Sequence, residues 1–247
     1  MILFGYLSVY FETMDTATKV WLYVADINKT EYDYDFWYSL MPQNRQEKIS
    51  RFRFEDDKKR GVVGWALICK ALKEYAGFSA KYVAQNITSS PKGKLFLAPS
   101  AQDIECKPYF NIAHSGDKVI CAVSDTEVGC DIEKKNNDGL KIAKRFFHET
   151  EYSYLEDIKS EDVREREFLK LWTMKEAFVK ATGDGIAFPM NEIAFVNDKG
   201  IIKDRVTYSD LQYCFCPADF DDGYAMTVCV KGDTCSCQRV DVKYLFE

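Results

Sequence analysis

Histidine is scarce in this sequence, and its cysteines are not spaced as metal-binding pairs. Of the 247 residues only His114 and His148 are histidines, and none of the nine cysteines forms a C-x-x-C pair. The nearest cysteines in the sequence are Cys214 with Cys216 and Cys235 with Cys237. This supply of ligands speaks against a zinc site. Cysteines within apolar runs instead fit a reducing compartment.

The chain also lacks a basic excess and any long apolar run. Asp and Glu number 39 against 33 Lys and Arg, so the net charge is −6, whereas nucleic-acid binders usually carry a basic excess. No apolar run reaches the roughly 18 residues of a membrane span. Residues 1–10 are apolar but have no basic flank or cleavage site, and we expect a strand there. The sequence therefore predicts a cytoplasmic protein that binds neither nucleic acid nor a membrane.

Hydrophobic periodicity predicts an α+β chain. Apolar residues recur at helical spacing in residues 55–76 and 164–182, and Gly77 and Gly183 would end these helices. Further helices are predicted at residues 140–147 and from Pro42 onward. Strands are predicted at residues 20–27, 109–112, 119–123, 128–133, 193–196, 211–216 and 224–230. We expect residues 119–123 and 128–133 to form a hairpin.

Two stretches of the sequence resemble each other. Gly116 precedes the apolar residues 119–123, and Gly223 precedes the similar residues 224–230. This repeat predicts two similar α/β halves, residues 1–115 and 116–247, that form a pseudo-dimer. A ligand or active site would then lie at their interface.

Asp131 and Glu133 flank Ile132 in the predicted strand 128–133. Alternate residues of a strand share a face, so both carboxylates point the same way. Neighbouring carboxylates repel each other unless a cation lies between them, and oxygen ligands of this kind suit magnesium. Taken alone, however, the pattern is more typical of a solvent-facing strand.

Glu176 and Lys180 lie four residues apart in the predicted helix 164–182, so their side chains share a face. Glu176 could complete a trio of carboxylates with the strand pair, and Lys180 could neutralise phosphate oxygens. The spacing by itself favours the alternative, an ordinary ion pair on an exposed helix.

Three other segments hold candidate ligand contacts. His114 ends an extended apolar run, and ends of strands commonly contact ligands. Lys94 belongs to the turn at residues 91–94. A basic stretch in residues 45–60 comprises Arg45, Lys48, Arg51, Arg53, Lys58, Lys59 and Arg60. The alternatives are a structural histidine, a solvated lysine and a solvated helix face.

These segments follow one another in the order typical of a known family. The motifs are Gly93-Lys94, F-N-I-x-H-S-G at residues 110–116, G-x-D-I-E at 129–133 and W-x-M-K-E-x-x-x-K at 172–180. With them the sequence resembles the 4′-phosphopantetheinyl transferases. It is most similar to their long, monomeric type with two similar halves, the type that activates surfactin synthetase. Each motif is weak alone, but the ordered set is specific.

Such enzymes transfer the phosphopantetheine arm of coenzyme A to a serine of an acyl or peptidyl carrier protein and release adenosine 3′,5′-bisphosphate. These carriers serve fatty acid, polyketide or non-ribosomal peptide synthesis. The resemblance implies that Asp131, Glu133 and Glu176 hold Mg²⁺ on the pyrophosphate. It also implies that coenzyme A is bound by Arg45, Lys48, Arg60, Lys94, His114, Asp131 and Lys180.

Because the nucleophile belongs to the carrier protein, this chain has only to supply a general base. The resemblance offers Glu176, which we favour, and Glu151, acting directly or through a water. Lys180 would act on the pyrophosphate. The carrier protein is expected to dock on a mostly apolar surface near residues 140–155, with Phe146 or Phe147 belonging to the core.

Three residues depart from the family pattern. Ala113 replaces a serine, Leu95 a proline and Asn44 a basic residue, which weakens the assignment of Arg45 and Lys48. Two other functions stay open: a non-catalytic protein that binds coenzyme A or a nucleotide, and a magnesium-dependent phosphodiesterase that uses water. The presence of all three carboxylates disfavours the first.

Overall fold

The computed structural model describes residues 17–98, 107–135, 139–185, 187–221 and 223–246. The strand expected at residues 1–10 lies outside these ranges. The helices are α1 (Tyr34–Ser39), α2 (Gln43–Ser50), α3 (Glu55–Ala76), α4 (Ala80–Asn86), α5 (Gly139–Phe146), α6 (Glu149–Asp157) and α7 (Glu161–Thr182), with a 3₁₀ turn at Met190–Glu192. The strands are β1 (Thr18–Asp26), β2 (Glu31–Tyr32), β3 (Ile87–Ser89), β4 (Leu95–Leu97), β5 (Tyr109–Ser115), β6 (Lys118–Ser124), β7 (Val128–Lys134), β8 (Arg205–Tyr208), β9 (Leu211–Asp221), β10 (Tyr224–Lys231), β11 (Cys235–Asp241) and β12 (Tyr244–Leu245). No helix in the described ranges is long and apolar enough to cross a membrane.

Two four-stranded sheets repeat one arrangement. The first has the strand order β11-β1-β6-β5 and the second has the order β7-β10-β9-β8. In the first sheet, β1 precedes the 22-residue helix α3, and the antiparallel pair β5 and β6 follows, with β6 between β1 and β5. In the second sheet, β7 precedes the 22-residue helix α7, and the antiparallel pair β9 and β10 follows, with β10 between β7 and β9. Both long helices end at a glycine with positive φ, 74° at Gly77 and 77° at Gly183, a conformation that glycine adopts without strain. The expected α+β fold with two similar halves is confirmed.

The prediction that residues 119–123 and 128–133 form a hairpin is wrong. Both segments are strands, but β6 pairs with β1 on one side and β5 on the other, so it has no free edge for β7. β7 pairs with β10 in the second sheet. Residues 125–127 therefore carry the chain from one sheet to the other. The predicted boundary between residues 115 and 116 falls in the turn between β5 and β6, within the first sheet.

The strand expected at residues 193–196 is also absent; the segment makes a single bridge, from Val196 to Ile202. The main-chain N–H of Phe195 donates to Glu151 Oε1 at 2.7 Å instead of to a neighbouring strand. An apolar run alone does not reveal that a side chain takes the place of a partner strand.

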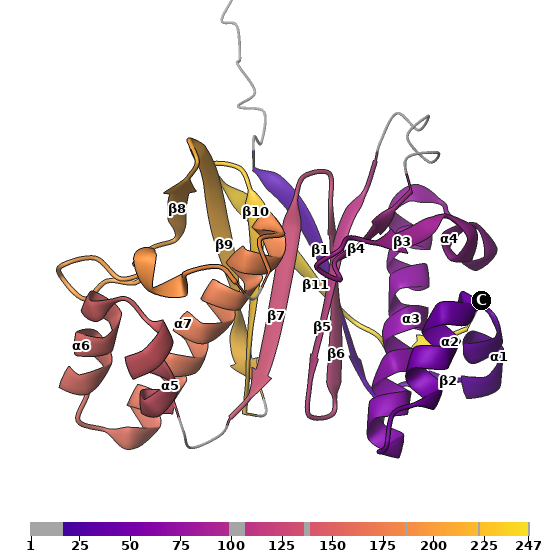
Figure 1. Ribbon diagram of the computed structural model, residues 1–247, viewed down its shortest axis with the longest axis horizontal. Coiled ribbons are helices and arrows are strands. Elements are labelled where there is room, and N and C mark those ends of the chain that lie inside the picture. The colour runs from indigo at the N-terminus through magenta and orange to yellow at the C-terminus, as the bar shows by residue number, and fades with distance from the viewer. Residues whose placement is uncertain (1–16, 99–106, 136–138, 186, 222, 247) are drawn as a thin grey trace, which may run out of the picture.

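The core has three layers of apolar contact. α3 covers the outer face of the first sheet and α7 that of the second, so the helices flank two sheets that pack on each other (Figure 1). In β7 the side chains of Val128, Cys130 and Ile132 enter the apolar cluster between the sheets. Because strand side chains alternate, Asp131 and Glu133 face α7.

Candidate active site between β7 and α7

Gly129 lets α7 lie directly against β7. A Cβ atom at this position would collide with the main-chain oxygen of Ala177 and nitrogen of Ala181, and would lie 2.8 Å from the carbonyl carbon of Lys180. Only glycine permits this approach of strand to helix. The first residue of the G-x-D-I-E motif thus brings Asp131 and Glu133 close to the side chains of α7.

Asp131 and Lys180 form the centre of the site. Asp131 is only 4% exposed, and its Oδ1 accepts a hydrogen bond from Lys180 Nζ at 2.5 Å. Its Oδ2 is buried and has no hydrogen-bond partner. An unsatisfied buried carboxylate oxygen is costly, so this atom is where a bound cation or donor would contribute most.

Glu133 and Glu176 complete the carboxylate group. Glu133 Oε2 accepts a hydrogen bond from Ser115 Oγ at 3.0 Å, which links β7 to the end of β5. Burial raises the pKa of Glu176, the Lys180 ammonium lowers it, and Glu133 raises it again. Glu133 and Glu176 are close enough to raise the pKa of Asp131, and their role as metal ligands stays a prediction.

Burial and neighbouring charges also shift the pKa values of Asp131 and Lys180. Burial raises the pKa of Asp131 to about 7 against the opposing pull of Lys180, with smaller contributions from Glu133 and Glu176. Burial disfavours the charged form of Lys180, but the nearby Asp131 outweighs it and raises the pKa of the ammonium. Asp131 and Glu176 thus share one ammonium in a poorly hydrated site, with Glu133 close to both carboxyls, and this excess of negative charge favours binding of a further cation.

His114 and Arg60 approach the site from the first sheet and α3. The surrounding protein and the positive charges of Arg60 and Lys180 lower the pKa of His114. Arg60 donates to the carbonyl oxygen of Gly116 at 2.6 Å and to Asp57 Oδ1 at 2.5 Å. His114, Arg60 and Lys180 therefore lie close together, and cationic and hydrogen-bonding groups arranged in this way suit phosphate groups.

Lys94 has a different environment from that expected of a ligand contact. Its ammonium donates to the carbonyl oxygens of Lys180, Ala181 and Val128 at 2.5, 3.0 and 3.3 Å. Burial lowers its pKa. An ammonium has three protons, so these carbonyls use all of them. Lys94 holds the last turn of α7 against β7.

The two basic residues of α2 lie apart from this group. The guanidinium of Arg45 lies 5.6 Å from the centre of the Trp65 ring, and burial lowers the pKa of Arg45. Lys48 is exposed. The structure does not bring either side chain to the carboxylates.

Glu151 is likewise not part of the carboxylate group. Its side chain is fully buried, and Lys175, 1% exposed, lies 2.9 Å from its Oε2. Both oxygens also accept main-chain N–H groups, Oε2 from His148 and Oε1 from Phe195. Lys175 donates further to the carbonyl oxygens of Met190 and Ile193. Glu151 thus joins α6, α7 and the 190–195 segment, and both of its oxygens are occupied by protein groups.

The carboxylates fit a magnesium ion in their donor chemistry. Carboxylate oxygens are the protein ligands that magnesium prefers, and Asp131 Oδ2 is a donor without a partner. In the described residues no three His, Cys, Asp or Glu side chains are already arranged as a metal site. With Lys180 on Asp131 Oδ1, binding of the ion requires the carboxylates to turn toward it.

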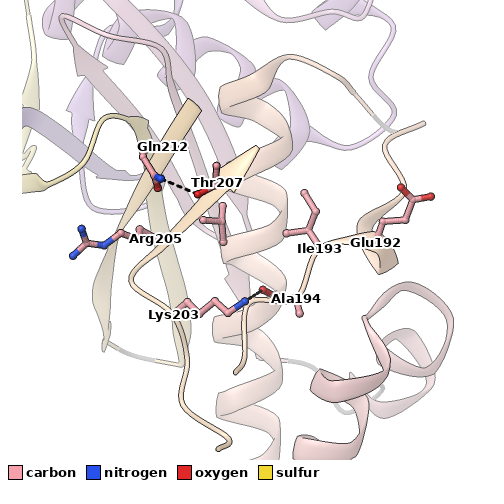
Figure 2. Close-up of a pocket in the computed structure, with 8 residues that line it drawn as sticks. Glu192, Ile193, Ala194, Lys203, Arg205, Thr207 and Gln212 are labelled. Atoms are coloured by element: carbon pink, nitrogen blue, oxygen red, sulfur yellow. Dashed lines mark hydrogen bonds between the residues drawn. The ribbon is translucent and has the colours of Figure 1, made fainter. Parts of the chain in front are cut away.

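A pocket of about 470 Å³ lies elsewhere, beside β8 and β9 (Figure 2). It is lined by Glu192, Ile193, Ala194, Lys203, Arg205, Val206, Thr207 and Gln212. Lys203 donates to the carbonyl oxygen of Ala194 and Gln212 donates to Thr207 Oγ1, so polar groups of the wall satisfy one another (Figure 2). None of the predicted site residues belongs to this pocket.

Sequence reasoning missed two residues that position the site. Ser115 holds Glu133 and also accepts the main-chain N–H of Lys134. Asp57 orients Arg60 from one turn earlier in α3. The spacing of three residues between Asp57 and Arg60 signals the second contact, whereas the first joins strands of different sheets and has no local signal.

Comparison with known proteins identifies the family. The sequence model described as "4'-phosphopantetheinyl transferase, N-terminal" matches residues 27–126, and that of the "4'-phosphopantetheinyl transferase superfamily" matches residues 127–229. A 4'-phosphopantetheinyl transferase of Bacillus subtilis is 33% identical over 81% of this chain and 85% of its own length. The transferase Sfp of Bacillus subtilis strain 168 is 32% identical over 77% and 82%, and HetI of a Nostoc species is 30% identical over 69% and 71%. The chain therefore belongs to the 4′-phosphopantetheinyl transferase superfamily.

Proposed function

We propose that this protein transfers the 4′-phosphopantetheine arm of coenzyme A to a serine hydroxyl of an acyl or peptidyl carrier protein, in a magnesium-dependent reaction. The observation that carries this proposal is the meeting of the Asp131–Lys180 pair with Glu133, Glu176 and His114 where the two halves join. The names of the relatives give the same activity.

In this reaction Asp131, Glu133 and Glu176 would hold Mg²⁺, which when bound neutralises phosphate oxygens. Lys180 would contact the pyrophosphate, and His114 and Arg60 would contact the adenosine and its 3′-phosphate. Cationic and hydrogen-bonding groups fixed in a poorly hydrated site stabilise the charge that develops on the leaving group. They also hold the pyrophosphate in line with the attacking serine.

Glu176 is the group that we assign as general base. The serine oxygen forms a bond to the phosphorus of the arm, the bond from that phosphorus to the bridging oxygen breaks, and adenosine 3′,5′-bisphosphate leaves. The proton of the serine passes to Glu176. In the metal-free protein burial and the nearby Glu133 raise the pKa of Glu176, and Lys180 lowers it. A bound Mg²⁺ would lower the proton affinity of this carboxylate, and we assign it as the base because it is the carboxylate of α7 at the metal site. Glu151 is not included, because its oxygens are enclosed by Lys175 and two main-chain N–H groups.

The carrier protein would dock on α5. Phe146 at the end of this helix is 40% exposed, whereas the next residue, Phe147, is 5% exposed and packs against Phe168. An exposed aromatic ring beside a buried one is a suitable anchor for an apolar partner helix. Arg145, whose guanidinium lies over the Phe146 ring, adds a positive charge for an acidic carrier.

The test of this function is a mass measurement on an apo carrier protein incubated with coenzyme A, magnesium and this protein. The carrier is expected to gain the mass of the arm, and a carrier whose serine is replaced by alanine is the matched control. Hydrolysis of coenzyme A without a carrier would instead support the phosphodiesterase. Binding of coenzyme A with no transfer to any of a panel of carriers would support the non-catalytic binder.

A further inference from the structure

Four cysteines of the second half gather at one edge of the interface between the sheets. Cys214 and Cys216 alternate along β9, and Cys235 and Cys237 alternate along β11. Because alternate residues of a strand share a face, each C-x-C pair presents two thiols on one side. Three of the four, Cys216, Cys235 and Cys237, are partly buried against the apolar cluster between the sheets, and Cys214 belongs to that cluster.

Cys216 and Cys235 are in direct contact, with their Sγ atoms 2.8 Å apart. A disulfide requires about 2.05 Å between the sulfurs, so only a small approach separates this thiol pair from a covalent bond. Both side chains are partly exposed, which makes them accessible to a small oxidant. Among the other cysteines in the described ranges, Cys237 is also partly exposed and the rest are buried.

The two strands that carry this pair belong to different sheets. β9 pairs with β10 and β8 in the second sheet, whereas β11 pairs in parallel with β1 in the first. A bond between Cys216 and Cys235 would therefore join the two sheets covalently. We propose that Cys216 and Cys235 form a reversible disulfide, with a small-molecule disulfide as oxidant, that fastens the two sheets together.

The chemistry balances as two thiol–disulfide exchanges. The Cys216 thiolate attacks one sulfur of the small disulfide and forms a mixed disulfide, and one small thiolate leaves. Cys235 then loses its proton and attacks the Cys216 sulfur, so that the second small thiol leaves. Two protein thiols are oxidised and one small disulfide is reduced to two thiols.

The order of attack follows from the surroundings of the two sulfurs. The hydrogen bond with Cys235 lowers the pKa of Cys216, which favours its thiolate. The hydrogen bonds with Cys214 and Cys216 raise the pKa of Cys235. Cys216 is therefore the attacking sulfur and Cys235 the resolving one.

A soft metal ion is the competing use of four thiols. In the described part of the chain, however, no three His, Cys, Asp or Glu side chains are placed to hold a metal. The geometry supports a pair of sulfurs rather than a tetrahedral cage.

The experiment oxidises the reduced, full-length protein with oxidised glutathione at pH 8, blocks the remaining thiols with iodoacetamide and maps the peptides by mass spectrometry. We expect a linked peptide pair containing Cys216 and Cys235, and a midpoint of thermal unfolding about 5 °C or more higher, since the bond closes a loop of chain. Dithiothreitol should reverse both changes.

Variants separate this pair from its neighbours. Cys216→Ser and Cys235→Ser should each lose the linked peptide and the thermal shift, whereas Cys237→Ser, the matched control, should keep both. Circular dichroism of the reduced variants checks their folding, and Cys216→Ala with Cys235→Ala replaces any variant that fails to fold. Persistent glutathione on Cys216 without a link, a link that includes Cys214 or Cys237 instead, or a link with no thermal shift would each overturn the proposal.

Discussion

Lys180 on α7 and Asp131 on β7 form an ion pair with Nζ 2.5 Å from Oδ1, while Asp131 Oδ2 is buried without a partner. The pair joins the long helix of the second half to the strand at which the two sheets meet. Lys180 thus occupies Asp131 Oδ1, and Oδ2 is left to bind a ligand.

This pair predicts how the stability of the metal-free protein depends on pH. Burial raises the pKa of Asp131 from 3.8 to about 7, so between these values the folded state binds a proton that the unfolded state does not. The free energy of unfolding therefore falls as pH rises from about 4 to about 7, by on the order of 2–4 kcal/mol from this group.

Urea unfolding in EDTA across this pH range measures the effect. Asp131→Asn, which carries no titrating group at this position, should show a correspondingly smaller fall. Identical pH profiles for the wild type and Asp131→Asn would contradict the assignment of the raised pKa.

Glu151→Gln should destabilise the protein without removing its chemistry. The change leaves the buried Lys175 ammonium without its counter-charge, and breaking a buried pair costs about 3–5 kcal/mol. Urea unfolding gives the stability, and kcat per folded molecule gives the chemistry. The matched control is Asp56→Asn in the exposed pair with Lys59, where we expect less than about 1 kcal/mol. A large loss of kcat at unchanged stability would instead make Glu151 a base.

Gly129→Ala should separate α7 from β7. The new methyl group would meet the main chain at Ala177, Lys180 and Ala181, and backbone cannot move aside as a side chain can. We expect a loss of about 3 kcal/mol or more in stability, together with loss of transfer activity. Gly64→Ala on α3 is the control, because its Cβ would meet only side-chain atoms of Ile112 and Val119. Equal effects of the two changes would show that the close approach at Gly129 does not matter.

Lys94→Met should weaken the attachment of the last turn of α7. It removes the donor to three carbonyl oxygens, at a cost of about 1–3 kcal/mol. The neighbouring Lys92→Met, on an exposed side chain, should cost little. In the folded fraction the KM for coenzyme A should stay near that of the wild type. A raised KM for coenzyme A with unchanged stability would instead indicate that Lys94 contacts coenzyme A.

Local pattern was enough to predict the long helices and six of the twelve strands in the described ranges, but not which strands pair. The helix at residues 55–76 and the glycine that ends it follow from spacing and from one backbone conformation. β7 pairs with β10, since β6 already has β1 on one side and β5 on the other. No local signal carries that information.

The same distinction holds for the site. Strand alternation and helical spacing predict that Asp131 and Glu133 share a face of the strand and that Glu176 shares one with Lys180, and the ordered motifs joined these residues into one predicted metal site. Glu151 and Lys94 belong to the same motif set, yet their partners are main-chain groups and a lysine of distant segments. Residue type and order cannot distinguish such a structural carboxylate or ammonium from one that contacts substrate.

The most direct test of the central claim is the rate of arm transfer by Glu176→Gln, measured as the mass gain of an apo carrier protein with coenzyme A and magnesium. Glu161→Gln, in the first turn of the same helix, is the control. We expect a rate lowered about 10²-fold or more for Glu176→Gln, with Glu161→Gln close to wild type and both proteins folded. A wild-type rate for Glu176→Gln would contradict the assignment of this carboxylate to the reaction.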